Sequence, residues 1–134
     1  MVDNKFNVLS LWNMHPYMYM VRPTNFPKAS PFAEEEMAEW QAFWNGLFKM
    51  AEQRGIDTYV VNWNIFLPEE FSRHYGEGGS YRGAQHYGDG VNSPAIETYT
   101  REIVTQTLNE YPNLTGIGLT LGERMGGMTS EERR

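Results

Sequence analysis

The sequence predicts an α/β fold in which parallel strands alternate with helices. Three short apolar segments are rich in β-branched and aromatic residues, and two amphipathic segments separate them. The turns that lead from each helix into the next strand are short, at residues 55–57 and 111–114. Strands joined through helices in this way pair in parallel by right-handed crossovers. The expected architecture is a single β-α-β-α-β unit over residues 1–134, a length typical of one domain.

The three predicted strands cover residues 5–13, 58–66 and 114–121. The first has a nearly continuous apolar run, which is typical of a strand buried on both faces in a parallel sheet. The second is identified by its β-branched and aromatic content. The third contains Gly116 and Gly118, which weaken a strand and indicate close packing there.

The first predicted helix begins at Ser30-Pro31, where Ser30 can cap it, and glutamates 34–36 favour the positive end of its dipole. Gly55 is expected to end it in a left-handed conformation. Trp40 and Trp44 lie on its apolar stripe and are expected in the core. The stripe consists of Met37, Trp40, Trp44, Leu47, Phe48 and Ala51.

The second predicted helix opens with Ser93-Pro94 and runs to about Glu110, where Tyr111-Pro112-Asn113 stops it. Its apolar stripe consists of Ile96, Tyr99, Ile103, Val104 and Leu108. Residues 129–134 are typical of the capped start of a further helix.

Composition excludes several classes of function. The formal net charge is −6 and the basic residues are scattered, so we expect no nucleic-acid partner. No apolar run approaches the roughly 20 residues of a membrane span, and residues 1–5 have no signal-peptide pattern, so we expect no membrane partner. The absence of cysteine excludes disulfides, thiolate metal sites and cysteine nucleophiles.

Cofactor and metal signals are weak. The glycine-rich stretch from Gly76 to Gly90 contains no phosphate-loop lysine pattern, so we expect no nucleotide cofactor. His74, His86 and Asp89 are candidate ligands, but their spacing matches no known motif. The sequence therefore predicts neither a cofactor nor a metal.

Connection lengths indicate where a site would lie. The two strand-to-helix connections, residues 14–30 and 67–93, are much longer than the two helix-to-strand turns. Loops beyond about 12–15 residues usually have a function or are disordered. Ligands of α/β proteins bind beyond the carboxyl ends of the strands, which is where these long connections begin.

The strand ends carry amides, indoles, a carboxylate and a guanidinium, a set that suits a sugar. The candidate residues are Trp12, Asn13, His15, Asn62, Trp63, Asn64, Glu123 and Arg124. Alternation along the second strand predicts Asn62 and Asn64 on one face and Trp63 on the other. Plain structural roles remain open for all of them, such as turn-forming asparagines, a turn histidine, core tryptophans, or a Glu123 that pairs with Arg124.

Several segments resemble a bacterial family of glycoside-hydrolase-like (β/α)8 barrels described as α-glucuronidase-like. They are residues 7–12, 15–16, 59–66, 111–118 and 122–125. The resemblance covers nearly the whole chain but only part of such a barrel, since a (β/α)8 barrel has eight strands in about 250 residues. It implies a partial TIM barrel. The sequence has Glu123-Arg124 where the family pattern has Glu-Asn.

The resemblance implies a glycoside hydrolase that acts on an oligo- or polysaccharide with a carboxylate acid/base. Glu123 is then the candidate catalytic residue, and its partner carboxylate is expected beyond Arg134. The isolated chain is expected to be inactive, and its partners to be a carbohydrate and either further barrel segments or a second copy. Two alternatives remain: a non-catalytic carbohydrate-binding protein and a self-assembling α/β protein.

Overall fold

A computed structural model describes residues 1–13, 15–63, 67–75 and 94–120. Within them the chain forms three strands, three α-helices and three short 3-10 turns (η). In chain order these are η1 (Val2–Asn4), β1 (Val8–Asn13), η2 (Pro16–Tyr19), η3 (Pro27–Ala29), α1 (Glu34–Glu52), β2 (Asp57–Trp63), α2 (Glu69–Tyr75), α3 (Pro94–Glu110) and β3 (Gly116–Thr120). The predicted β-α-β-α-β order is confirmed, with one helix added.

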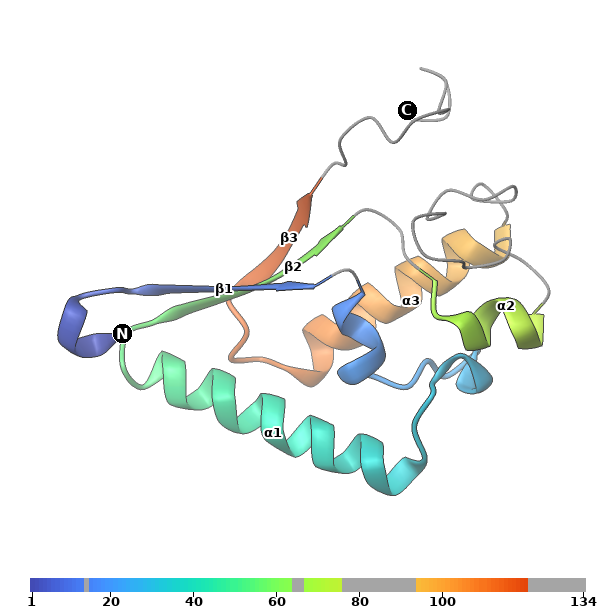
Figure 1. Ribbon diagram of the computed structural model, residues 1–134, viewed down its shortest axis with the longest axis horizontal. Coiled ribbons are helices and arrows are strands. Elements are labelled where there is room, and N and C mark those ends of the chain that lie inside the picture. Colours follow the sequence, from blue (N-terminus) through green and yellow to red (C-terminus); the bar gives the residue numbers. More distant parts are fainter. Residues whose placement is uncertain (14, 64–66, 76–93, 121–134) are drawn as a thin grey trace, which may run out of the picture.

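The sheet has the strand order β1-β2-β3, and both pairs are parallel. The helices α1 and α3 lie on the same side of it (Figure 1). The two faces of the sheet differ in burial, as the alternating side chains of β2 show. Thr58, Val60 and Asn62 are buried, whereas Tyr59 and Val61 are half-buried. One face of the sheet therefore carries the helices and the core, while the described part of the chain leaves the other face open.

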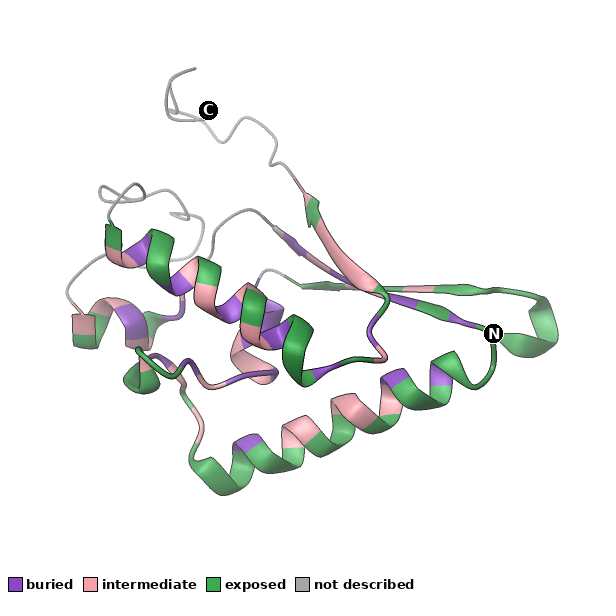
Figure 2. Cartoon of the chain, turned by 180° about the vertical axis from the view of Figure 1, so that it is seen from behind, coloured by how far each residue is buried: buried purple, intermediate pink, exposed green. Residues whose placement is uncertain are grey.

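The strand β1 differs from the expectation that it is buried on both faces. Val8 is 48% exposed and Trp12 is 55% exposed, whereas Leu9 and Leu11 on the opposite face are half-buried. Two features of the sheet explain the difference. The strand β1 is an edge strand, and the described helices cover only the face that carries Leu9 and Leu11 (Figure 2).

The helix α1 begins three residues later than the sequence predicts. Ser30 Oγ accepts the backbone N–H of Phe32 at 3.4 Å, so Ser30 stabilises a turn before the helix rather than capping it. The first helical turn is closed instead by Glu36, whose carboxylate accepts the N–H of Ala33 at 3.0 Å. At the other end the prediction is confirmed, since Gly55 has a φ of 67°.

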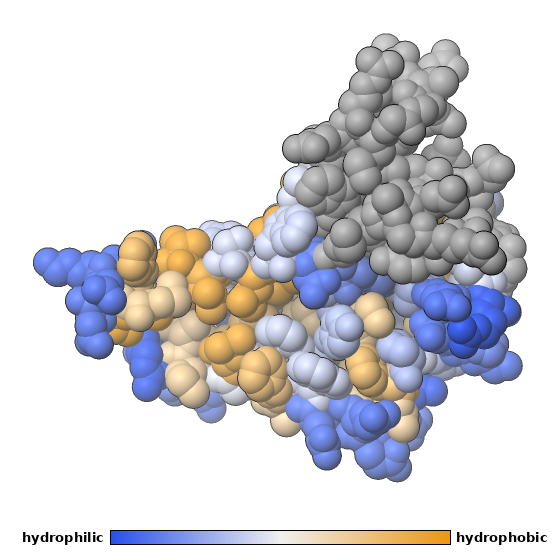
Figure 3. Space-filling view, viewed as in Figure 1, coloured by the Kyte–Doolittle hydropathy of each residue, from blue (hydrophilic) through white to orange (hydrophobic). Residues whose placement is uncertain are grey.

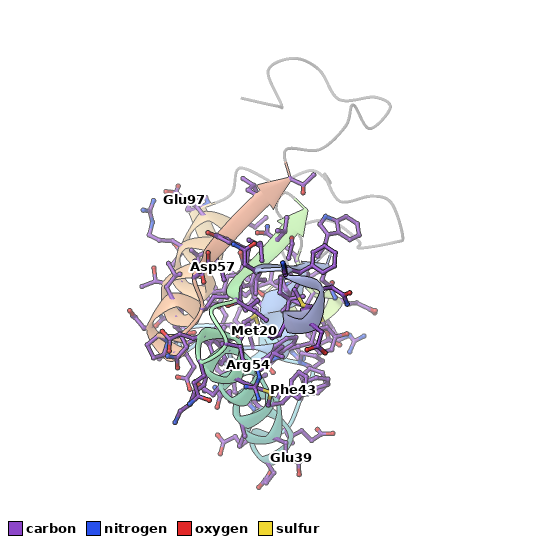
Figure 4. The ribbon with its side chains drawn as sticks, turned by 90° about the vertical axis from the view of Figure 1, so that its left-hand side faces the viewer. Met20, Glu39, Phe43, Arg54, Asp57 and Glu97 are labelled. Carbon is purple, nitrogen blue, oxygen red and sulfur yellow. The ribbon has the colours of Figure 1, made fainter. Side chains whose placement is uncertain are left out.

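The connection after β1 is part of the core. Tyr17, Met20 and Val21 are each at most 4% exposed, and Figure 4 shows Met20 between α1 and the sheet. Two side chains fix its backbone: the indole Nε1 of Trp44 donates to Tyr19 O at 2.7 Å, and the hydroxyl of Tyr111 donates to Met20 O. Trp40 and Trp44 are both half-buried, and Trp44 packs against the core as expected.

The sequence predicts a loop over residues 67–93, and this is wrong for residues 69–75, which form the short helix α2. The helix is anchored by Phe71, which is fully buried with its ring 4.7 Å from that of Tyr99 and 5.4 Å from that of Phe26. Seven residues are too few to show a helical period, which explains why the sequence pattern does not reveal it. Among the described residues, no helix is both long and apolar enough to span a membrane.

Candidate functional site

The carboxyl ends of β1 and β2 bring two asparagines together. Asn13 is the register partner of Asn62, so the two side chains leave neighbouring strands on the same face of the sheet. That face is the one covered by helices, because Thr58 and Val60 precede Asn62 at alternating buried positions. The sequence predicted both residues at this edge, but it did not predict that their face is turned toward the core.

His15 lies directly beyond β1 and is buried, with 7% of its surface exposed. Its Nε2 is 3.0 Å from the hydroxyl oxygen of Tyr99, and its ring meets those of Tyr17 and Tyr99 edge-on. Burial lowers the pKa of His15 to about 3. The imidazole is therefore neutral near pH 7, and one of its nitrogens is a hydrogen-bond acceptor.

Tyr17 occupies the space between His15 and Asn62. Its hydroxyl donates to Asn62 Oδ1 at 2.8 Å, and both residues are buried. Burial raises the pKa of Tyr17 to about 12. Burial and the nearby Glu102 carboxylate also raise the pKa of Tyr99. Both phenols are therefore protonated at neutral pH and remain hydrogen-bond donors.

Asn13 differs from Asn62 because its side chain is exposed. The backbone N–H of His15 donates to Asn13 Oδ1 at 3.1 Å. A backbone N–H can only donate, which fixes the side-chain oxygen toward His15 and turns the amide nitrogen away from it. The edge of β1 thus presents an amide group in one orientation.

Trp12 lies on the opposite, open face of the sheet. Its register partner is Val61, which in turn is the partner of Gly118, so a large side chain stands beside a small one and a glycine. The backbone of Trp63 is placed in β2 opposite Thr120. Asn64, Glu123 and Arg124, like His86 and Asp89, lie outside the described residues.

Tyr17 and Tyr99 pair with two of the candidate residues, and the sequence pattern singles out neither of them. Tyr99 was assigned only to the apolar stripe of its helix, and nothing in the non-periodic stretch after β1 marks Tyr17 as a partner of Asn62. A chain separation of 84 residues between His15 and Tyr99 leaves no local signal. In the part of the chain that the structure describes, no three His, Asp or Glu side chains gather closely enough to hold a metal ion.

The fold and this edge together define a parallel α/β unit with helices on one face and polar side chains at the carboxyl ends of its strands. A solved structure with the same fold is that of a protein described as a GH138 enzyme targeting pectin rhamnogalacturonan II. The TM-score is 0.77, and the sequence identity is 32% over 99% of this chain. No protein-family model matches the sequence, and no curated protein sequence does.

This likeness relates the chain to a glycoside hydrolase at the level of fold and sequence. The chain spans 14% of the length of the enzyme that it matches. The similarity therefore concerns one portion of a much larger protein.

Proposed function

We propose that this chain is a sector of the (β/α)8 barrel of a glycoside hydrolase. The observation that carries the proposal is the strand order β1-β2-β3, all parallel, with α1 and α3 on one face. Strands that follow one another in sequence, with their helices on one side, are the repeating unit of such barrels. A doubly wound sheet instead reverses its strand order and has helices on both faces.

The open face of the sheet supports a barrel interior. A Cβ atom added to Gly118 would lie 2.9 Å from Val61 Cγ2, and one added to Gly116 would lie 3.3 Å from Tyr59 Cε1. Large side chains therefore fill the space that the glycines leave. The interior of a TIM barrel is likewise filled by layers of side chains, each layer contributed by alternate strands.

The flanks of the sector support neighbouring barrel units. On the β1 side, apolar surface extends over β1 toward α1 (Figure 3). Phe43 and Met50 are each more than half exposed, and Phe43 lies on the side of α1 away from α3 (Figure 4). At the other edge, Leu119 of β3 is 57% exposed on the face that carries the helices. Exposed apolar surface of this kind is typical of an interaction surface.

The proposed substrate is a carbohydrate bound at the carboxyl edge of the strands. The half-exposed indole of Trp12 offers a flat apolar surface, and Asn13 offers hydrogen-bond donors at the same end of β1. Trp63, Asn64 and Arg124 belong to the same proposed substrate-binding set. The buried His15 and Asn62 are proposed to support that set from beneath. Glu123, which follows β3, is the proposed acid/base, and a second carboxylate from another strand would complete the catalytic pair.

The experiment has two parts. Pectin rhamnogalacturonan II oligosaccharides are titrated into the 134-residue chain, where binding without hydrolysis is expected. The same oligosaccharides are then given to the natural protein that contains this sequence, where hydrolysis should be lost in the Glu123→Gln variant. Unchanged turnover in that variant would remove Glu123 from the mechanism.

A second candidate function is self-assembly, which the exposed flank of β1 and α1 favours. Two copies could pair through their β1 edges, since an edge strand presents unpaired backbone groups. Sedimentation velocity of the 134-residue chain, combined with the oligosaccharide titration, separates the two proposals. A defined dimer that binds none of the oligosaccharides would favour assembly over carbohydrate chemistry.

A further inference from the structure

The segment His15–Tyr17 follows β1 and forms hydrogen bonds to the carboxyl ends of both β1 and β2. The backbone N–H of His15 donates to Asn13 Oδ1 on β1, and the hydroxyl of Tyr17 donates to Asn62 Oδ1 on β2. The same segment is held from α3, because Tyr99 contacts the imidazole of His15. Each asparagine oxygen is thus engaged by this segment.

The two asparagines differ in how far they are buried. Asn62 is 7% exposed and lies among the helices, so its amide contributes to the packing beneath the sheet. Asn13 is exposed, and its oxygen is turned toward His15. What Asn13 offers to a ligand is therefore its amide nitrogen, which carries two N–H donors and no acceptor.

We infer that the segment His15–Tyr17 divides the roles of the two asparagines: Asn13 donates hydrogen bonds to an acceptor oxygen of the bound sugar, and Asn62 holds the segment in place. This inference rests on the proposed carbohydrate site and assigns to it one recognition element. The acceptor oxygen belongs either to a sugar hydroxyl or to the carboxylate of an acidic sugar. His15 acts through Asn13 and is a positioning residue.

The buried imidazole is suited to positioning. It is enclosed by the edges of Tyr17 and Tyr99, and its Nε2 is paired with a phenol that α3 fixes. A side chain held between Tyr17 and Tyr99 leaves its own backbone little freedom, so the N–H of His15 stays directed at Asn13. This geometry keeps the amide of Asn13 in one orientation before a ligand binds, which reduces the entropy lost on binding.

The Asn13→Asp substitution tests the donor role. Aspartate keeps an oxygen that can accept the N–H of His15, so the turn after β1 is retained, but it replaces the two donors by an acceptor. The probes are galactose and galacturonic acid, which differ by a carboxylate, together with rhamnogalacturonan II oligosaccharides. We expect binding to weaken about tenfold or more in N13D, as for the loss of one good hydrogen bond to a ligand.

The two sugars distinguish the sources of the acceptor oxygen. An equal loss for both in Asn13→Ala indicates a hydroxyl oxygen, and a loss confined to galacturonic acid indicates its carboxylate. The matched comparison is Asn62→Ala, which should lower the melting temperature, whereas N13D, which keeps the oxygen that accepts the N–H of His15, should not. Undiminished binding of all probes to a folded N13D variant would overturn the donor role.

Side-chain NMR tests the positioning role without any ligand. The two N–H resonances of Asn13 should be dispersed in the wild-type chain and move toward those of a free asparagine in His15→Ala. His15→Gln, whose amide can still pair with Tyr99, should restore them in part. Tyr99→Phe, which breaks the same bond from α3 without removing a ring, provides a second variant if H15A does not fold. Unchanged Asn13 resonances in H15A or Y99F would contradict the positioning role.

The experiments distinguish a failure of the carbohydrate proposal from a failure of the positioning role of His15. A wild-type chain that binds none of the probes would refute the carbohydrate proposal and the ligand role of Asn13 with it. The resonances of Asn13 would still decide separately whether His15 fixes that side chain.

Discussion

His15 and Tyr99 are separated by 84 positions in the chain, yet a 3.0 Å hydrogen bond joins the imidazole Nε2 to the phenol oxygen in the core. The bond ties the connection after β1 to the N-terminal half of α3. Because both residues are buried, neither group can exchange its partner for water without opening the core. The strand ends that carry the candidate site are therefore supported from the helix layer.

The first prediction concerns this bond. Tyr99→Phe leaves the imidazole without its partner in a buried position, so we expect a loss of about 1–3 kcal/mol in the free energy of unfolding. Urea denaturation measures it. Tyr75→Phe is the matched control, because its hydroxyl accepts the N–H of Lys28 in an exposed bond, and the expected loss there is smaller. Equal losses in the two variants would contradict a special role for the buried bond.

The second prediction is a dependence of stability on pH. The folded chain holds the pKa of His15 at about 3, whereas the unfolded value is near 6.5. Between these values the unfolded state binds a proton that the folded state does not, so stability is present above pH 6.5 and is lost as the pH falls toward 3.

The slope from His15 should approach about 1.4 kcal/mol per pH unit within that window. It is measured by urea denaturation at a series of pH values. The His15→Gln variant should lose this part of the slope. The matched His74→Gln variant, at an exposed histidine, should retain it. If the His15→Gln variant keeps the wild-type slope, the pH dependence of stability in this window does not come from His15.

The third prediction concerns the open face of the sheet. Gly118→Ala places a Cβ 2.9 Å from the stiff side chain of Val61, so a loss of about 1–3 kcal/mol is expected. Adding Val61→Ala should relieve the clash, which a double-mutant cycle of unfolding free energies measures. Gly46→Ala, in a helix with open space around it, should instead stabilise the chain by about 0.5–1 kcal/mol. Additive effects of the Gly118 and Val61 changes would argue against direct contact.

The fourth prediction concerns the flank formed by β1 and α1. If barrel neighbours normally cover Phe43 and Met50, the isolated chain should associate as its concentration rises. Sedimentation velocity should show that Phe43→Ser with Met50→Ser reduces this association. Glu39→Ser, which removes an exposed polar side chain from the same helix, should not. Association that is unaffected by the double substitution would place the contact elsewhere.

The sequence pattern predicts the fold better than it predicts the site. The order of strands and helices follows from β-branched runs, helical spacing and stop signals such as Gly55, all of which are local. The start of α1 was misplaced because Ser30 forms a turn of its own. The helix α2 was missed because its one fully buried residue, Phe71, gives no period.

The position of the candidate site at the strand ends also follows from local signals, namely long connections and polar residues. The partners of those residues do not. Tyr17 and Tyr99 reach Asn62 and His15 through contacts between distant parts of the chain. The burial of Asn62 depends on which face the helices cover, and strand alternation alone does not determine that choice.

We propose that this sequence is one sector of a larger carbohydrate-active barrel. The most direct measurement is the intact mass of the natural product that contains it, by mass spectrometry of protein from its native source. A sector of a larger barrel should come from a product whose mass is well above the 15.5 kDa of these residues. A natural product of 15.5 kDa would contradict the barrel and leave the binding and assembly proposals in its place.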